Sequence, residues 1–126
     1  MTDPMPPAPG SDPGRYFVRA DPAAARELRP GVALRAVAGD ALMLSVVTFE
    51  PGAEVPDHAH PHEQMGIMLS GRLEFTIASR NEVLEVGDIW RIPSNVPHRA
   101  RALGGPAVAL DVFHPVREDY RSPGDR

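Results

Sequence analysis

The chain alternates short runs of apolar and polar positions with turn residues from residue 32 onward. Leu73, Phe75 and Ile77, for example, alternate with polar residues, as in a strand with one buried face. Pairs such as Pro51-Gly52 and Gly104-Gly105 separate such runs. The pattern predicts eight strands, at residues 32–37, 42–49, 64–69, 73–77, 83–86, 89–92, 98–103 and 107–113. Strands at this spacing indicate an all-β fold, a closed or double-sheet antiparallel barrel.

The segments outside these strands predict one helical turn and two tails. Asp21-Pro22 followed by good helix formers as far as Leu28 predicts a helix with an N-cap and a first-turn proline. Residues 1–14 contain five prolines and few apolar side chains, which predicts a flexible tail. We therefore expect one domain over residues 15–121 and a short tail at 122–126.

Composition narrows the classes of function. The chain has 126 residues, a net charge of −4 and no cysteine, so any metal site must use nitrogen or oxygen ligands. The mixed, mildly negative charge argues against a nucleic-acid partner. No apolar run is long enough to span a membrane and no signal peptide is evident, so a cytoplasmic location is expected.

Four of the five histidines lie in two stretches of chain that could converge. His58, His60 and His62 alternate, and Gln64 continues their parity, so an extended backbone would place all four on one face. His98 comes from a separate predicted strand. Neutral imidazoles are common ligands of transition metals, so the pattern predicts a site for one divalent ion: zinc, nickel, manganese, iron or cobalt.

These histidines lie within two motifs that resemble those of cupins. Gly52, His58, His60, Gln64 and Gly71 follow the first cupin motif, with glutamine in place of its usual glutamate. The second motif is matched by Gly87, Pro93 and His98, with Asn95 at the usual glycine.

The resemblance implies a double-stranded β-helix (jelly-roll) barrel, and barrels of this type usually pair as homodimers. It also implies metal ligation by His58, His60, Gln64 and His98. His62 is expected to face the substrate, with ligation as the alternative. For Gln64, the alternative is that it points away and the histidines hold the ion alone.

A glutamine ligand changes the expected chemistry. Gln64 is neutral, so a divalent ion held by it and three histidines would keep its full charge and act as a strong Lewis acid. This favours non-redox chemistry on a carbonyl or enol, although three-histidine sites also occur in some cupin dioxygenases.

A second group of residues surrounds a carboxylate in an apolar strand. Asp111 interrupts residues 107–113, where a buried charge is costly unless it is paired or functional. Phe113 shares its face, and Arg117 follows. A structural pairing of Asp111 with an arginine is the alternative to an acid–base role.

The sequence is similar here to the pectin-degradation cupins of the KdgF type, which open cyclic unsaturated uronates to linear keto acids. The resemblance implies that Asp111 moves the proton and that Phe113 and Arg117 contact the substrate. Met68 and Arg91 depart from that family's pattern and are candidates for further substrate contacts, with a surface position as the alternative for Arg91.

The predicted function is therefore a metal-dependent ring opening, tautomerisation or isomerisation of a small carboxylated carbonyl or enol compound. Three alternatives remain: a cyclase or isomerase of polyketide-type metabolism, an iron-dependent dioxygenase, and a cupin that binds a small ligand without turning it over.

Overall fold

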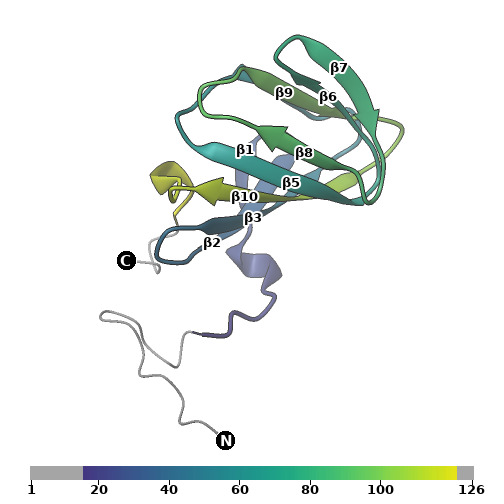
Figure 1. Ribbon diagram of the computed structural model, residues 1–126. Coiled ribbons are helices and arrows are strands. Elements are labelled where there is room, and N and C mark those ends of the chain that lie inside the picture. Colours follow the sequence, from purple (N-terminus) through teal and green to yellow (C-terminus); the bar gives the residue numbers. More distant parts are fainter. Residues whose placement is uncertain (1–15, 122–126) are drawn as a thin grey trace, which may run out of the picture.

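Two antiparallel sheets face each other and enclose one core (Figure 1). The structure is a computed structural model that describes residues 16–121, so the predicted tails at 1–14 and 122–126 lie outside the described residues. The six-stranded sheet has the order β1-β2-β3-β10-β5-β8, and the four-stranded sheet has the order β4-β9-β6-β7. The prediction of an all-β jelly roll is confirmed.

Each predicted strand has a counterpart in the structure. The six-stranded sheet consists of β1 (Arg26–Arg29), β2 (Val32–Ala38), β3 (Met43–Phe49), β10 (Ala107–His114), β5 (Glu63–Ser70) and β8 (Ile89–Ile92). The four-stranded sheet consists of β4 (Glu54–His58), β9 (His98–Ala102), β6 (Leu73–Ile77) and β7 (Arg80–Leu84).

The core forms from the inward positions of both sheets. In β3 and β10 every second residue is buried, as the alternation of apolar residues predicts. Leu34, Met43, Met68 and Leu73 are among the largest fully buried side chains. Three polar side chains, Gln64, Asp111 and His98, are buried on the same inward faces, and this places the candidate site inside the barrel.

The predicted helix over residues 21–28 is wrong beyond its first turn. Asp21 does accept a hydrogen bond from the amide of Ala23, at 3.0 Å, and caps a 3-10 turn, η2 (Pro22–Ala24). Residues 26–29 instead form β1, which pairs with β2 at the edge of the sheet. A helix of eight residues is marginal alone, so pairing with an existing sheet outweighs the local helix propensity.

The histidine stretch is not one continuous strand. β4 ends at His58 in the four-stranded sheet, residues 59–62 form a connection, and β5 begins at Glu63 in the six-stranded sheet. The prediction that His58, His60, His62 and Gln64 share one strand face is therefore wrong. The chain changes sheets between them, and this crossing brings their side chains together inside the barrel.

Candidate metal centre

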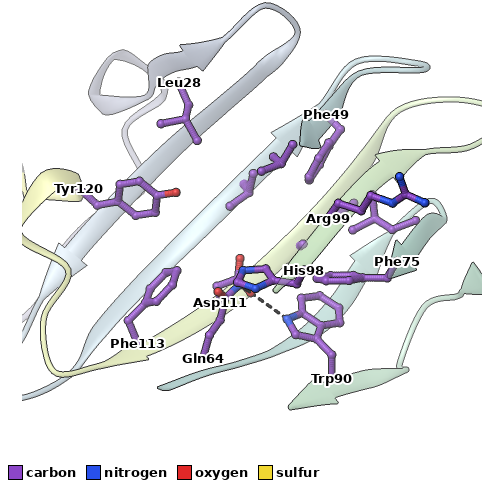
Figure 2. Close-up of a pocket in the computed structure, with 15 residues that line it drawn as sticks. Leu28, Phe49, Gln64, Phe75, Trp90, His98, Arg99, Asp111, Phe113 and Tyr120 are labelled. Atoms are coloured by element: carbon purple, nitrogen blue, oxygen red, sulfur yellow. Dashed lines mark hydrogen bonds between the residues drawn. The ribbon is translucent and has the colours of Figure 1, made fainter. Parts of the chain in front are cut away.

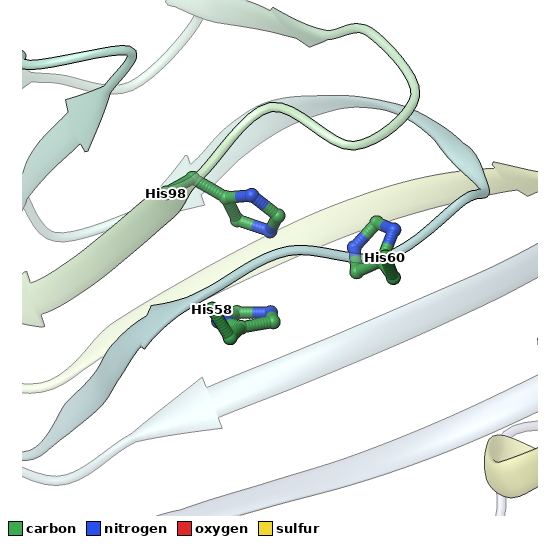
Figure 3. A group of neighbouring side chains, drawn as sticks. All are labelled: His58, His60 and His98. Carbon is green, nitrogen blue, oxygen red and sulfur yellow. The ribbon is translucent and has the colours of Figure 1, made fainter.

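Three histidine rings meet at one end of the barrel (Figure 3). His58 ends β4, His98 begins β9 directly opposite it, and His60 lies in the connection to β5. One nitrogen from each ring lies within 4.8 Å of those of the other two. The rings of His58 and His98 have centroids 4.2 Å apart, and those of His60 and His98 are 4.9 Å apart. The sequence prediction that separate stretches of chain bring these three histidines together is confirmed.

The same kind of contact, between Nδ1 and a backbone carbonyl oxygen, orients each of the three rings. The Nδ1 atoms of His58, His60 and His98 lie 2.9, 3.0 and 2.9 Å from the carbonyl oxygens of Pro56, His62 and Val96 respectively. A carbonyl can only accept, so each Nδ1 carries the proton and each Nε2 keeps a free lone pair. Metal-binding histidines are typically held in this tautomer by their other nitrogen.

The loop that carries His60 is fixed by the second motif. The amide of Asn95 donates to the carbonyl oxygen of His60 at 2.8 Å. Asn95 has a φ of 65°, a left-handed conformation that asparagine tolerates better than most residues. This explains why asparagine can stand where the cupin motif usually has glycine.

Gln64 completes a set of four neutral ligand atoms. Its Nε2 donates to Oδ1 of Asp111 at 2.9 Å, and this turns Oε1 toward Nε2 of His60, 3.0 Å away. With Nδ1 of His60 protonated, these two facing atoms are both acceptors and need a cation or a second proton between them. Adjacent ligands of an octahedral ion with bonds of about 2.1 Å lie ~3.0 Å apart, so the spacing fits a shared metal.

Burial favours the neutral imidazole of His60 and of His98, the form that binds a metal ion. Desolvation lowers the pKa of His98 to about 4, and it also lowers the pKa of His60, with a further contribution from the charge of Arg117. Nε2 of His98 is buried and has no hydrogen-bond partner among the described residues. A buried lone pair without a partner is costly, and a metal ion would satisfy it.

Asp111 lies beside the candidate ligands as a buried carboxyl group. Oδ1 accepts from Nε2 of Gln64 and from Nε1 of Trp90, both at 2.9 Å. Burial raises the pKa of Asp111 to about 6, although both hydrogen bonds and the charge of Arg117 oppose the rise. Because Oδ1 already accepts two N–H groups, Oδ2 is the oxygen that gains or loses the proton near neutral pH.

Arg117 packs against two aromatic rings. Its Cζ lies 4.0 Å from the ring centroid of Tyr120 and 5.6 Å from that of Phe113. Its Nε donates to Asp119 at 3.0 Å, and within residues 16–121 no hydrogen bond to its two terminal nitrogens is present. A nearly buried guanidinium with both terminal nitrogens available can bind a carboxylate.

A narrow cavity of about 50 Å³ adjoins this site, and Gln64, His98 and Asp111 form its polar part (Figure 2). Apolar side chains from both sheets form the remaining wall, among them Val47, Phe49, Val55, Leu73, Phe75 and Ala100. Leu28 of β1 and Tyr120 of η3 (Glu118–Tyr120) border it on one side, where Arg26 Nη2 donates to the carbonyl oxygen of Asp119 at 2.6 Å.

The structure brings only some of the predicted substrate contacts to this cavity. Phe113 lines it. His62 lies beside His60, with ring centroids 5.4 Å apart, but outside the three-histidine cluster. Met68 is packed in the core, and Arg91 is exposed on the outer face of β8, so neither lines the cavity.

Two residues of the site were missed from the sequence. Trp90, the single tryptophan, donates to Asp111, and Tyr120 borders the cavity. The alternation of Trp90 and Ile92 on a predicted strand was a usable signal, because a buried indole N–H needs an acceptor. No sequence pattern indicated Tyr120, which reaches the barrel through the turn after β10.

Comparisons with known proteins agree with this architecture. The Cupin domain family model matches residues 45–113, which include all four candidate ligands. KdgF from Halomonas sp. is 28% identical, with a TM-score of 0.74 over 77% of this chain and 90% of that one. An RmlC-like cupin from Shewanella frigidimarina is 26% identical, with a TM-score of 0.79 over 84% of this chain and 96% of that one.

A more distant enzyme shares the fold alone. Oxalate decarboxylase from Lactobacillus farciminis is 22% identical, with a TM-score of 0.68 over 75% of this chain and 32% of that one. No curated protein matches the chain in sequence. No helix within residues 16–121 is long and apolar enough to cross a membrane. The family model covers more than half of the sequence, and the chain belongs to the cupin family.

Proposed function

We propose that this cupin is a metal-dependent enzyme that opens, tautomerises or isomerises a small carboxylated carbonyl or enol compound without a redox change. The observation that carries the proposal is the pairing of a neutral ligand set with a titratable carboxyl group. Oδ1 of Asp111 accepts from the amide of Gln64, a candidate ligand, at 2.9 Å. An acid–base group and a cation site therefore adjoin the same cavity.

His58, His60, His98 and Gln64 would hold the ion. A divalent ion with four neutral ligands supplies Lewis acidity that polarises a carbonyl or enol oxygen. None of the four ligands is a carboxylate, in contrast to the two-histidine, one-carboxylate set of many iron oxygenases. This difference supports the non-redox reaction over the dioxygenase.

Asp111 would move the proton. The pKa of Asp111, raised by burial to about 6, lies near the operating pH of a cytoplasmic enzyme, where a carboxyl group can both accept and return a proton. As a C–H or O–H bond of the substrate breaks, Oδ2 takes its proton, and the proton then returns at the other end of the conjugated system. No atom is gained or lost.

Arg117 would bind the acid group of the substrate, and Phe113 would support the side chains of Arg117 and His60. The ring of Phe113 packs edge-on to that of His60, with centroids 5.8 Å apart, and its centroid lies 5.6 Å from Cζ of Arg117. Because Arg117 is near enough for its charge to lower the pKa of Asp111, a carboxylate bound by Arg117 would lie in the neighbourhood of Asp111.

The test uses unsaturated galacturonate, because the sequence resembles the KdgF-type cupins. Metal-loaded protein should accelerate loss of the cyclic enol signal in NMR, and Asp111→Asn should abolish the acceleration while retaining the metal. No acceleration by loaded protein would remove the uronate assignment. Oxygen uptake by the iron-loaded form would favour a dioxygenase instead.

A further inference from the structure

We infer that the site prefers a keto or enol acid with a short hydrocarbon body, and that a polyhydroxylated sugar acid is a poorer substrate. This inference rests on the proposed function and adds the class of substrate. The cavity that adjoins Asp111 is the space into which the body of a reacting substrate would extend. The side chains that line the cavity therefore limit which functional groups the body of the substrate can carry.

Most polar groups of the cavity are already engaged. Both ends of the Gln64 amide have partners, Oδ1 of Asp111 accepts two hydrogen bonds, and Nε1 of Trp90 donates one of them. Nε2 of His98 points toward the proposed metal. The guanidinium of Arg99 is directed outward, where its Nε donates to Thr76 at 3.3 Å.

Among the described residues that line the cavity, the hydroxyl of Tyr120 and Oδ2 of Asp111 are the groups left for a substrate hydroxyl. Each further hydroxyl would be buried against Val47, Phe49, Leu73 or Phe75 without a partner. A polar group buried without a hydrogen bond weakens binding by roughly tenfold or more. A sugar acid carries a hydroxyl on most of its carbon atoms, so this wall selects against it, whereas a hydrocarbon body gains from the same contacts.

The size of the cavity sets the length of that body. It measures about 50 Å³. A dry cavity of ~150 Å³ binds benzene, which has six carbon atoms, so this one has room for about two carbon atoms. The two terminal methyl groups of a branched aliphatic 2-keto acid are of this size, which makes such an acid a well-matched probe.

The experiment compares two keto acids that differ by one group. 4-Methyl-2-oxopentanoate carries a methyl group where 4-hydroxy-2-oxopentanoate carries a hydroxyl. With zinc-loaded protein in deuterated water, NMR measures the exchange of the hydrogens next to the carbonyl. We expect kcat/KM for the methyl compound to exceed that for the hydroxyl compound at least tenfold. Equal values, or a preference for the hydroxyl compound, would overturn the inference.

The unsaturated uronate separates this inference from the proposed function. If the uronate is opened and neither keto acid exchanges, the substrate class is wrong and the proposed reaction stands. If neither the uronate nor the keto acids react with metal-loaded protein, the proposed function fails and this inference fails with it.

A cavity-filling variant tests whether the hydrocarbon body of the substrate occupies this cavity. Ala100→Val adds two methyl groups at the cavity wall, and Ala33→Val adds the same two on the outer face of β2 as a control. We expect Ala100→Val to lower the ratio of kcat/KM for 4-methyl-2-oxopentanoate over pyruvate at least fivefold, and Ala33→Val to leave the ratio unchanged. Thermal unfolding and metal content confirm folding of each variant. The same ratio in both variants would overturn the inference.

Discussion

At the scale of single residues, the position of each proton largely defines this site. Three Nδ1 atoms donate to backbone carbonyls, so three Nε2 atoms present lone pairs, and the amide of Gln64 adds an oxygen. The four ligand atoms are neutral and they adjoin the carboxyl group of Asp111. A divalent ion is the partner that these groups share.

Removal of one ring should remove the metal. His98→Ala deletes the most buried of the three imidazoles, and we expect at least a hundredfold loss of affinity for zinc or nickel, measured by competition with a chelator. His114→Ala is the matched control, because His114 is exposed and lies outside the cluster. Equal affinity in both variants would contradict the assignment of His98 as a ligand.

Asp111→Asn should stabilise the metal-free protein at neutral and higher pH while it removes activity. Folding raises the pKa of Asp111 from 3.8 to about 6, so the unfolded carboxyl loses its proton first and stability is lost as pH rises through this window. Asparagine keeps an oxygen for Gln64 and Trp90 but carries no charge.

Urea unfolding tests the predicted direction of this stability difference. Near pH 8 the metal-free variant should be more stable than the wild type by about 1–3 kcal/mol, and near pH 3.5 the difference should vanish. His98 has the opposite pH dependence, because folding lowers its pKa and its stabilisation is lost on acidification. Since His98 is present in both proteins, comparing the variant with the wild type at the same pH cancels its contribution. A variant that is less stable at both pH values would contradict the account.

The sequence predicted these residues through motif spacing, but it could not predict which substrate contacts face inward. Arg91 was selected for its charge, whereas strand alternation places its neighbour Trp90 inside the barrel. Met68 does face inward, but it packs in the core and does not line the cavity. Which inward side chain reaches the cavity depends on the register of β5 against β8 and β10, which local sequence does not specify.

At the scale of secondary structure, the elements that were missed or misplaced from the sequence lack the usual signals. β4 contains Pro56, which argues against a strand, but β4 lies at the edge of its sheet, where an absent N–H is tolerated. β7 begins three residues earlier than predicted. Its hairpin with β6 turns at Ala78 and Ser79, both with positive φ, so no glycine or asparagine marks the turn.

The contact between β5 and β8 supports the acid–base group. A Cβ atom on Gly66 would lie 2.3 Å from the ring of Trp90, so only glycine lets the indole lie across β5 and reach Asp111. Gly66→Ala should displace the ring, destabilise the fold by about 1–3 kcal/mol and shift the fluorescence of Trp90. Because Trp90 is the single tryptophan, the spectrum reports on this contact alone.

Gly105→Ala provides the control for that variant. Nothing lies within 4 Å of a Cβ atom at Gly105, and its φ is not positive, so its stability and fluorescence should match the wild type. Unchanged fluorescence in Gly66→Ala would mean that the indole does not depend on the glycine.

At the scale of the whole molecule, the six-stranded sheet has an outer apolar face. It consists of outward side chains of β3, β10, β5 and β8, namely Leu44, Met65, Ile67, Leu69, Ile89, Leu110 and Val112. A contiguous apolar surface of this kind typically marks an interface. We expect a homodimer through this face, in agreement with the expectation from the cupin resemblance.

Leu110→Glu should convert the dimer to a monomer, as measured by analytical ultracentrifugation. The change puts a charge at the centre of the outer apolar face, since Leu110 lies between Val46 and Ile67. Val83→Glu makes the same change at an exposed position of the four-stranded sheet and should leave the dimer intact. A wild-type protein that sediments as a monomer would refute this interface.

The proposed chemistry requires that imidazoles from both motifs and one amide oxygen hold a single divalent ion. X-ray absorption spectroscopy of zinc-loaded protein tests this arrangement, together with the number of ions per chain. We predict one ion per chain, with three imidazole nitrogens and further oxygen ligands. Failure to take up an ion, or a first coordination sphere with fewer than three imidazoles, would contradict the account.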